Sequence, residues 1–439
     1  MIHVRLPEAE VERLNEPVLP KGPLLDEFGQ YALRSWSGKT RTEQELKSGI
    51  RGQLESAASR KWPENFSRWG GWKDRKIGEG TGFFRTHNDG RRWWLVDPDG
   101  YAFWSAGLDC VRVDTEARID GITQALKWTP DQQGEFADAY RSSRNLRMPG
   151  TMVNFLAANM IRALGREGWR DKWAKLTFAE MKRLRFNTVG NWSEWEQARS
   201  AAFPYVRPMS FAARRSGMVY RDFPDVYHRD FELDVTDYAA PLKDTANDPA
   251  FIGYFLMNEP TWGFASETPA AGMLFNTEQC AAREELARFL RRKYADDAAL
   301  ASAWVRPATF DQIRKGKWTG ALPKPAADDL REFSSAMVER YFTALSKACK
   351  QADSNHLNLG MRWAGRPPEW AVEGMKAFDV FSLNCYEEKL PLSLAEKIHS
   401  MVKRPVLVGE WHFGSLDVGL PASGIGHTRN QADRGAAYR

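Results

Sequence analysis

The chain has 439 residues, and 43% of them are hydrophobic, which is enough apolar material for a large folded core. Its formal charge of +5 comes from 62 basic and 57 acidic residues spread along the chain, without the basic run that tracks phosphate groups, so we expect no nucleic-acid partner. No apolar stretch approaches the length of a membrane span, and the first residues lack a basic segment followed by an apolar one, so we expect no membrane partner and no signal peptide in this chain.

The four cysteines indicate neither a zinc site nor a disulfide framework, because their spacing matches no metal-binding pattern: Cys110, Cys280, Cys349 and Cys385. Cys349 continues an apolar helical stripe that begins at Phe333, which predicts a buried thiol. We expect no metal and no other cofactor.

Two turn motifs separate short apolar segments between residues 83 and 106 and predict antiparallel hairpins: Asn88-Asp89-Gly90 and Asp97-Pro98-Asp99-Gly100. Seven strand-like runs follow in chain order: Phe103 to Val113, Phe186 to Trp192, Tyr205 to Phe211, Phe251 to Met257, His356 to Trp363, Val380 to Tyr386 and Arg404 to Gly409.

Helical patterns separate most of these runs. Strands that alternate with helices predict a parallel sheet, and this many of them predict an α/β fold of the (β/α)8 TIM-barrel type. We find no eighth run, since only a loop and the helical start from Gln431 remain, so we expect a barrel truncated before its eighth strand and preceded by short β-hairpin strands.

Two glutamates follow strand-like runs directly. Glu259 comes just after the fourth run, and Glu410 comes just after the seventh. Because the carboxyl ends of parallel strands meet at one rim of a barrel, the fourth and seventh positions place both acids at opposite sides of the mouth, facing inward. Paired carboxylates in such a place suggest hydrolysis of a glycosidic bond.

A single glutamate at a strand end is usually a solvated or ion-paired loop residue. Here Asn258 adds an amide that can hold a sugar hydroxyl, and Pro260 has no backbone donor and ends the strand. Several aromatic residues are expected at the same rim, where they would offer flat faces to a pyranose: Trp262, Trp411, Phe413 and Tyr386. Together these residues favour a sugar site.

The motifs resemble those of glycoside hydrolase family 50, the β-agarase-like members of the retaining clan A barrels. The resemblance covers residues 22 to the end and is carried by Leu25-Asp26-Glu27-Phe28-Gly29-Gln30, Trp93-Trp94-Leu95-Val96-Asp97-Pro98-Asp99-Gly100, Phe223-Pro224-Asp225-Val226, Asn258-Glu259-Pro260 and Gly409-Glu410-Trp411-His412-Phe413-Gly414. The Asn-Glu-Pro motif is shared across the clan and is only moderately specific, whereas the first and last motifs are more specific to the family.

The resemblance implies roles for four residues. It makes Glu259 the general acid/base, Glu410 the nucleophile, Asn258 the partner of the hydroxyl next to the anomeric carbon, and Tyr386 a hydroxyl donor to the nucleophile. It also implies an oligosaccharide or polysaccharide substrate, with cleavage of β-galactosidic linkages in an agarose-like galactan by double displacement.

The resemblance suggests two regions. Residues 1–80 form an N-terminal lead-in segment, interpreted as the remnant of a β-sandwich domain and a linker, and residues 81–439 form a catalytic (β/α) barrel that is incomplete at its C-terminal end. We make no prediction of location, except that an intact protein acting on a polymer would be secreted or periplasmic.

Further residues are candidates by position. Trp363, at the end of the fifth run, is either a sugar platform or a rim-filling side chain, and we favour the platform. His412 either binds a sugar hydroxyl or is hydrogen-bonded within its loop. Asn191 and Trp192 lie at the end of the second run, and we expect them to contact the substrate because of this position. Glu387 is interpreted as a solvent-exposed loop charge.

Other functions stay open. The chain is alternatively a β-galactosidase or another clan A β-glycosidase that acts on a different polysaccharide, or an inactive carbohydrate-binding barrel. A metallohydrolase that uses His412 and Glu410 is the least favoured alternative, because no second histidine lies at ligand spacing.

Overall fold

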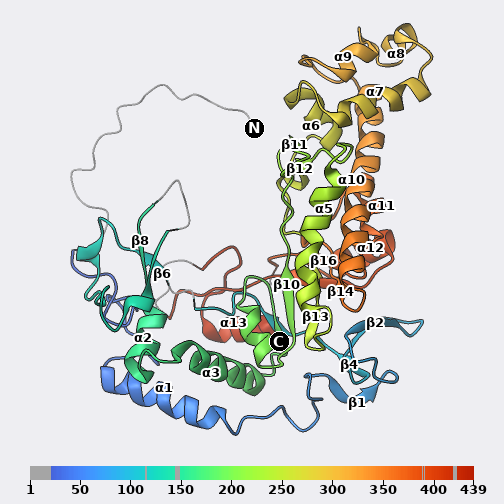
Figure 1. Cartoon of the computed structure of the whole chain (residues 1–439). Helices are drawn as coiled ribbons and strands as arrows, with labels where there is room; N and C mark the ends of the chain where they lie inside the picture. Colours follow the sequence, from blue (N-terminus) through green and yellow to red (C-terminus); the bar gives the residue numbers. More distant parts are fainter. Residues whose placement is uncertain (1–20, 114–115, 144–148, 388, 390, 419–422) are drawn as a thin grey trace.

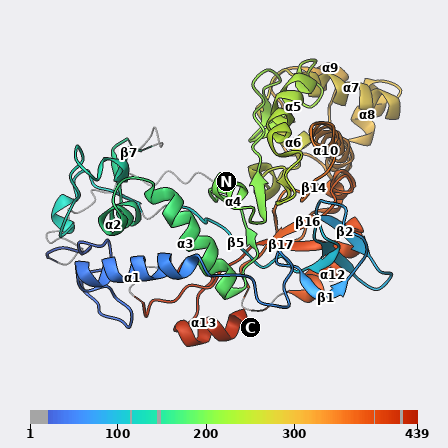
Figure 2. The same ribbon diagram turned by 60° about the horizontal axis from the view of Figure 1, so that its bottom comes forward.

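The computed structural model describes residues 21–113, 116–143, 149–387, 389, 391–418 and 423–439. Its parallel strands lie between helices α1 to α3 (residues 43–184) on one side and helices α5 to α10 (residues 231–352) on the other (Figure 1). Figure 2 shows the same separation after rotation. Within the described ranges, no helix has both the length and the apolar character that crossing a membrane requires.

The predicted hairpins are confirmed as a four-stranded antiparallel sheet. Its order is β1 (Trp72–Lys76), β4 (Tyr101–Phe103), β3 (Trp93–Val96), β2 (Arg85–Asn88). Gly100 closes the second turn with a φ of 93°, and a Cβ at this position would lie 2.1 Å from the carbonyl oxygen of Gly78. Only glycine fits both constraints.

Each of the seven predicted runs contains a strand, and these strands pair in parallel. They form two sheets, in the orders β14-β13-β10-β9-β5 and β15-β16-β17. The structure thus confirms a mixed α/β fold with a parallel sheet and antiparallel hairpins. Among the described residues, no strand pairs with the outer edge of β5 or of β17. The bounds are β5 (Gly107–Leu108), β9 (Thr188–Val189), β10 (Tyr205–Pro208), β13 (Phe251–Phe255), β14 (Leu357–Asn358), β15 (Trp363–Ala364), β16 (Phe381–Asn384) and β17 (Val406–Glu410).

The fifth run is divided between the two sheets, whereas the sequence predicted one continuous strand. Strand β14 pairs with β13, and β15 pairs with β16. Between them, Gly360 and Arg362 have φ values of 77° and 50°, which are incompatible with extended backbone. This break turns the chain between the two sheets.

The helices pack on the outside of the parallel strands. The longest is α10 (Lys324–Ala352), whose buried stripe includes Cys349, so the predicted buried thiol is confirmed. The other α-helices are α1 (Glu43–Ala57), α2 (Phe155–Leu164), α3 (Trp169–Leu184), α4 (Trp195–Ser200), α5 (Phe231–Ala239), α6 (Pro269–Asn276), α7 (Ala281–Lys293), α8 (Asp297–Ala303), α9 (Phe310–Arg314), α11 (Val372–Met375), α12 (Leu392–Val402) and α13 (Gln431–Tyr438).

Smaller elements decorate the connections. A three-stranded antiparallel sheet follows β5, in the order β6 (Glu116–Arg118), β8 (Thr151–Asn154), β7 (Tyr140–Ser142). A hairpin of β11 (Met218–Tyr220) and β12 (Phe223–Pro224) follows β10. Short 3-10 helices are η1 (Thr123–Ala125), η2 (Ala137–Ala139), η3 (Ala240–Thr245), η4 (Thr261–Phe264) and η5 (Glu369–Ala371).

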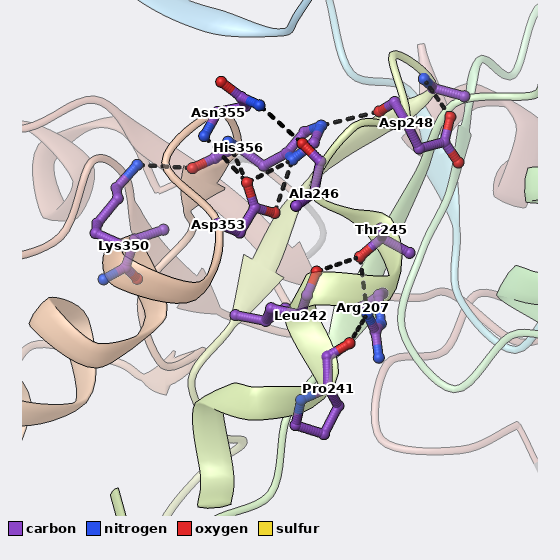
Figure 3. Close-up of polar contacts among 12 residues, drawn as sticks. Arg207, Pro241, Leu242, Thr245, Ala246, Asp248, Lys350, Asp353, Asn355 and His356 are labelled. Atoms are coloured by element: carbon purple, nitrogen blue, oxygen red, sulfur yellow. Dashed lines mark hydrogen bonds and ion pairs between the residues drawn. The ribbon is translucent and has the colours of Figure 1, made fainter. Parts of the chain in front are cut away.

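Buried polar contacts tie together the segments that precede β13 and β14 (Figure 3). The Nδ1 atom of His356 lies 2.7 Å from Oδ2 of Asp353, and Nε2 lies 2.9 Å from the carbonyl oxygen of Asp248. Because a carbonyl only accepts, Nε2 carries a proton. Nearby, Nη1 of Arg207 donates to Oγ1 of Thr245 at 2.8 Å. The His356 contacts lie at the amino ends of β13 and β14, where polar residues serve stability.

Candidate active site

The structure brings Glu259 and Glu410 together at the carboxyl ends of the parallel strands. Glu410 is the last residue of β17, and Glu259 lies four positions beyond the end of β13. Both residues are half-buried. Glu259 has a φ of 41°, a left-handed conformation that costs free energy for a residue with a Cβ and that is found preferentially at functional sites.

A single amide bridges the two carboxylates. The Nδ2 atom of Asn384, the last residue of β16, donates to Oε1 of Glu259 at 2.8 Å and to Oε2 of Glu410 at 3.0 Å. These bonds to one nitrogen keep the two oxygens within about 6 Å of each other, the sum of the two distances. Asn384 is only 3% exposed, so its amide is held in place by packing.

Sequence reasoning missed Asn384, although a signal for it was present. It is a polar residue near the end of the sixth run, just as Glu410 directly follows the seventh, but it carries no charge and so did not suggest acid/base chemistry.

Tyr386 contacts the other oxygen of Glu410. Its hydroxyl donates a short hydrogen bond to Oε1 of Glu410. Burial raises the pKa of the Tyr386 hydroxyl well above its ordinary value, and the hydrogen bond to the Glu410 carboxylate raises it further. Tyr386 therefore keeps its proton and acts as a donor at any pH near neutrality.

A buried arginine lies beneath Glu410. The Nη2 atom of Arg362 lies 3.1 Å from Oε2 of Glu410 and 2.7 Å from Oδ2 of Asp109, and it donates to the carbonyl oxygen of Gly409 at 2.5 Å. The Arg362 side chain is fully buried, and its guanidinium lies over the ring of Trp192 at 4.4 Å. One cation therefore faces two carboxylates.

Asp109 follows β5, and its side chain is 29% exposed. Its Oδ1 accepts from the backbone N–H of Asn191 at 2.7 Å. Burial raises the pKa of the Asp109 carboxyl, and the charge of Glu410 adds to this, against the opposing effects of Arg362 and the Asn191 N–H. The sequence did not predict the pairing of Asp109 with Arg362. The two residues are 253 positions apart, so no local sequence pattern connects them.

The loop that carries Glu259 is anchored by the β11–β12 hairpin. Asp222, in the turn of the hairpin, accepts from the backbone N–H of Thr261 at 2.9 Å and from that of Trp262 at 3.1 Å. Arg221 donates to the carbonyl oxygen of Thr261 at 3.1 Å. These bonds cap the start of η4 and fix the backbone just beyond Glu259.

Other predicted polar residues lie at the same rim. Asn258 is exposed beside Glu259. Asn191 is only 1% exposed, and neither Oδ1 nor Nδ2 has a hydrogen-bond partner among the described residues. Trp192 is half-buried and has a φ of 55°, and its ring is covered by Arg362. Asn191 and Trp192 therefore line the buried base of the site.

The interpretation of Trp363 as an exposed sugar platform is wrong. Trp363 is only 4% exposed because it packs against Trp262, with ring centroids 5.7 Å apart, and against the backbone of Gly263. Trp262 and Phe413, also expected to offer faces at the rim, are 1% and 6% exposed. These aromatics fill the interior beneath the rim.

Two other candidates remain accessible. Trp411 is 41% exposed and packs at tilted angles near Phe413 and Tyr438, with ring centroids at 5.3 and 5.5 Å. His412 is half-buried, and its ring contacts that of Tyr386 at 5.0 Å. Its Nε2 atom has no hydrogen-bond partner in the described part of the chain. The alternative of a histidine hydrogen-bonded within its loop therefore does not apply to this atom.

In the ranges that the structure describes, no group of three or more histidine, cysteine, aspartate or glutamate side chains is arranged to hold a metal ion. The three carboxylates of the site are instead arranged around Asn384 and Arg362.

Known proteins resemble this chain closely in fold and distantly in sequence. No protein-family model matches it. Over 94% of its length the chain is 27% identical to β-agarase B of Vibrio sp. (strain JT0107), of which it covers 48%. The chain thus spans about half the length of the curated relative it matches.

Solved structures give the same result. The chain matches PfGH50B with a TM-score of 0.86 and 27% identity, over 95% of this chain and 65% of that one. It matches an exo-β-agarase with a TM-score of 0.85 and 25% identity, over 96% of this chain and 66% of that one. In its motifs, in its sequence over almost all of its length and in its fold, this chain is similar to the β-agarase-like family 50 of the glycoside hydrolases.

Proposed function

We propose that this chain is a retaining glycoside hydrolase that cleaves β-galactosidic linkages in an agarose-like galactan. The observation that carries the proposal is the bridge from one Asn384 amide nitrogen to Glu259 and Glu410, at 2.8 and 3.0 Å. The bridge keeps the two oxygens within about 6 Å of each other, which is compatible with the separation of about 5 to 5.5 Å between carboxyl groups that double displacement uses and is below the spacing of about 6.5 to 9.5 Å in inverting enzymes. The galactan substrate is proposed from the similarity to the β-agarases.

In the first step, an oxygen of Glu410 attacks the anomeric carbon while Glu259 protonates the departing glycosidic oxygen. The hydrogen bond from Tyr386 and the ion pair with Arg362 orient the Glu410 carboxylate for this attack. In the second step, Glu259, now ionised, takes a proton from water, and the water oxygen displaces Glu410 from the sugar. The configuration at the anomeric carbon is retained.

We further propose that the parallel strands are part of a (β/α)8 barrel. Their pairing in chain order within each sheet, from β5 to β14 and from β15 to β17, supports this architecture. In this proposal residues 81–439 contribute the catalytic barrel and residues 1–80 lead into it.

The nucleophile is tested with Glu410→Gly. This variant should lose hydrolysis, and added azide or formate, which fits the vacated space, should restore turnover of an activated aryl glycoside and give a product of inverted configuration. The matched control is Glu387→Gly, because Glu387 is exposed one residue beyond Tyr386 and contacts neither catalytic carboxylate. Activity of Glu410→Gly near the wild-type level without an added anion would contradict the assignment.

The acid/base is tested with Glu259→Ala. Without the proton donor, substrates with poor leaving groups should lose far more activity than activated aryl glycosides, whose leaving groups need little protonation. Equal losses on both kinds of substrate would mean that Glu259 has only a structural role. Agarose oligosaccharides compared with other β-galactosides and β-glucosides then define the sugar.

A further inference from the structure

Arg362 has an unusual electrostatic environment for a buried cation. Its side chain is fully buried, and a single nitrogen, Nη2, makes both ion pairs, to Asp109 at 2.7 Å and to Glu410 at 3.1 Å. Its Nε and Nη1 atoms have no hydrogen-bond partner among the described residues. The two carboxylates therefore provide the neutralising charge for this guanidinium, with support from the ring of Trp192.

This arrangement has a consequence once Glu410 reacts. In the resting site, one positive charge faces two negative charges. When the Glu410 oxygen bonds to the anomeric carbon, the carboxylate becomes a neutral ester and Arg362 loses that partner. A buried cation without a partner is strongly unfavourable, but Asp109 still pairs with Arg362 at that stage.

We propose that Asp109 is a positioning residue whose charge keeps Arg362 paired while Glu410 is esterified. In the resting site the Asp109 carboxylate competes with Glu410 for Arg362. Arg362 therefore holds Glu410 in place but stabilises its negative charge less than it would without Asp109. Asp109 thereby favours formation of the covalent intermediate and prolongs its lifetime. This inference rests on the proposed function, in which Glu410 is the nucleophile.

Charged and titratable groups face Glu410 from each neighbouring element. They are Asp109 after β5, Glu259 after β13, Arg362 before β15 and Tyr386 after β16. Asp109 acts on Glu410 in two ways, because the two negative charges repel each other directly and both carboxylates compete for the same Nη2 of Arg362. Removing its charge therefore strengthens the pull of Arg362 on Glu410.

The test compares the wild type with Asp109→Asn, which keeps the shape of the side chain and removes its charge. With Glu residues labelled with ¹³C at Cδ, the pH midpoint of the Glu410 signal should fall by about one pH unit in Asp109→Asn. Arg362→Gln should move the same midpoint in the opposite direction. Glu387→Gln is the control. It removes an exposed charge that solvent screens, so the pH midpoint of the Glu410 signal should not change.

A second measurement follows the intermediate directly. A 2-deoxy-2-fluoro glycoside with an activated leaving group should form a stable adduct on Glu410, observed by intact-protein and peptide mass spectrometry. Asp109→Asn should form it more slowly and lose it about tenfold faster than the wild type. A residue with a merely structural role would slow both steps alike.

The outcomes separate the two proposals. If the wild-type adduct forms on a residue other than Glu410, the proposed function fails, while the ¹³C titration still tests the link from Asp109 through Arg362 to Glu410. If the adduct forms on Glu410 and Asp109→Asn changes neither its lifetime nor the titration midpoint, the role of Asp109 is refuted. If Arg362→Gln does not fold, the measurements on Asp109→Asn alone test the role of Asp109.

Discussion

Replacement of Asn384 by alanine removes the only side chain that contacts both proposed catalytic carboxylates in the described structure. The Nδ2 atom makes one hydrogen bond to each, and a hydrogen bond to a charged group contributes about 1.5 to 3 kcal/mol. Water that enters the space would replace part of this contribution, so we expect a net loss of about 2 to 4 kcal/mol in transition-state stabilisation, or a fall of about 30- to 1,000-fold in kcat/KM.

The assay uses two substrates, an agarose oligosaccharide and an activated aryl glycoside. Because Asn384 contacts both the proposed acid and the proposed nucleophile, Asn384→Ala should slow both reactions. Glu259→Ala should spare the activated substrate. The two variants are therefore distinguished by their substrate dependence.

Ser382→Ala provides the matched control. Ser382 lies two residues earlier on β16, on the same face, is 1% exposed, and its Oγ has no hydrogen-bond partner among the described residues. We expect a change of less than about threefold in kcat/KM for this variant, since it removes no contact to a carboxylate. If Asn384→Ala were as active as Ser382→Ala on both substrates, the bridging role of Asn384 would be refuted.

Three other predictions follow from burial and close contact. Trp363→Ala should lower the free energy of unfolding by about 3 to 5 kcal/mol in urea, whereas Trp411→Ala, at a 41% exposed position, should cost less than about 1 kcal/mol and weaken substrate binding instead. Gly409→Ala would place a methyl group 2.2 Å from Oγ of Ser382, so its activity should fall about tenfold and recover when Ser382→Ala is added. Asp234→Asn should destabilise the fold at neutral pH, and by less at low pH.

The sign of the last effect follows from the hydrogen bonds to Asp234. Burial raises the pKa of this carboxyl, but hydrogen bonds from Ser216 and Arg215 outweigh burial and leave the pKa below its ordinary value. Its stabilising contribution is therefore fully present above about pH 4 and is lost as the pH falls through the lowered pKa. Urea denaturation at several pH values measures this. A difference from wild type that grew as the pH fell would contradict the argument.

The other two predictions have clear opposing outcomes. Equal losses of unfolding free energy for Trp363→Ala and Trp411→Ala would mean that the burial of Trp363 does not determine its contribution. Persistence of the Gly409→Ala defect after removal of the Ser382 hydroxyl would mean that the close contact is not its cause.

The strand pattern predicted most of what positions the site. Short apolar runs that end in a polar residue predicted the parallel strands, and Glu259 and Glu410 were found from this pattern alone. The fifth run was different, because its break depends on the left-handed conformation of Arg362, and a non-glycine residue gives no sign of such a conformation in sequence.

Side-chain environments were harder to predict than strand positions. Trp363 and Trp411 both follow strand-like runs, yet one is buried against Trp262 and the other is exposed. Which of two aromatic residues faces solvent depends on contacts between distant segments, as does the pairing of Arg362 with Asp109 across 253 residues. Neither depends on a local period that sequence analysis can detect.

The break between β14 and β15 assigns the two proposed catalytic glutamates to separate sheets. Glu259 follows the sheet that contains β13, and Glu410 belongs to the sheet that contains β17. Two features of different kinds therefore connect the carboxylates, the bend at Gly360 and Arg362 in the backbone between the sheets and the Asn384 bridge between the side chains. Substitutions at this bend offer a way to tune the reaction geometry while both glutamates and their strands stay unchanged.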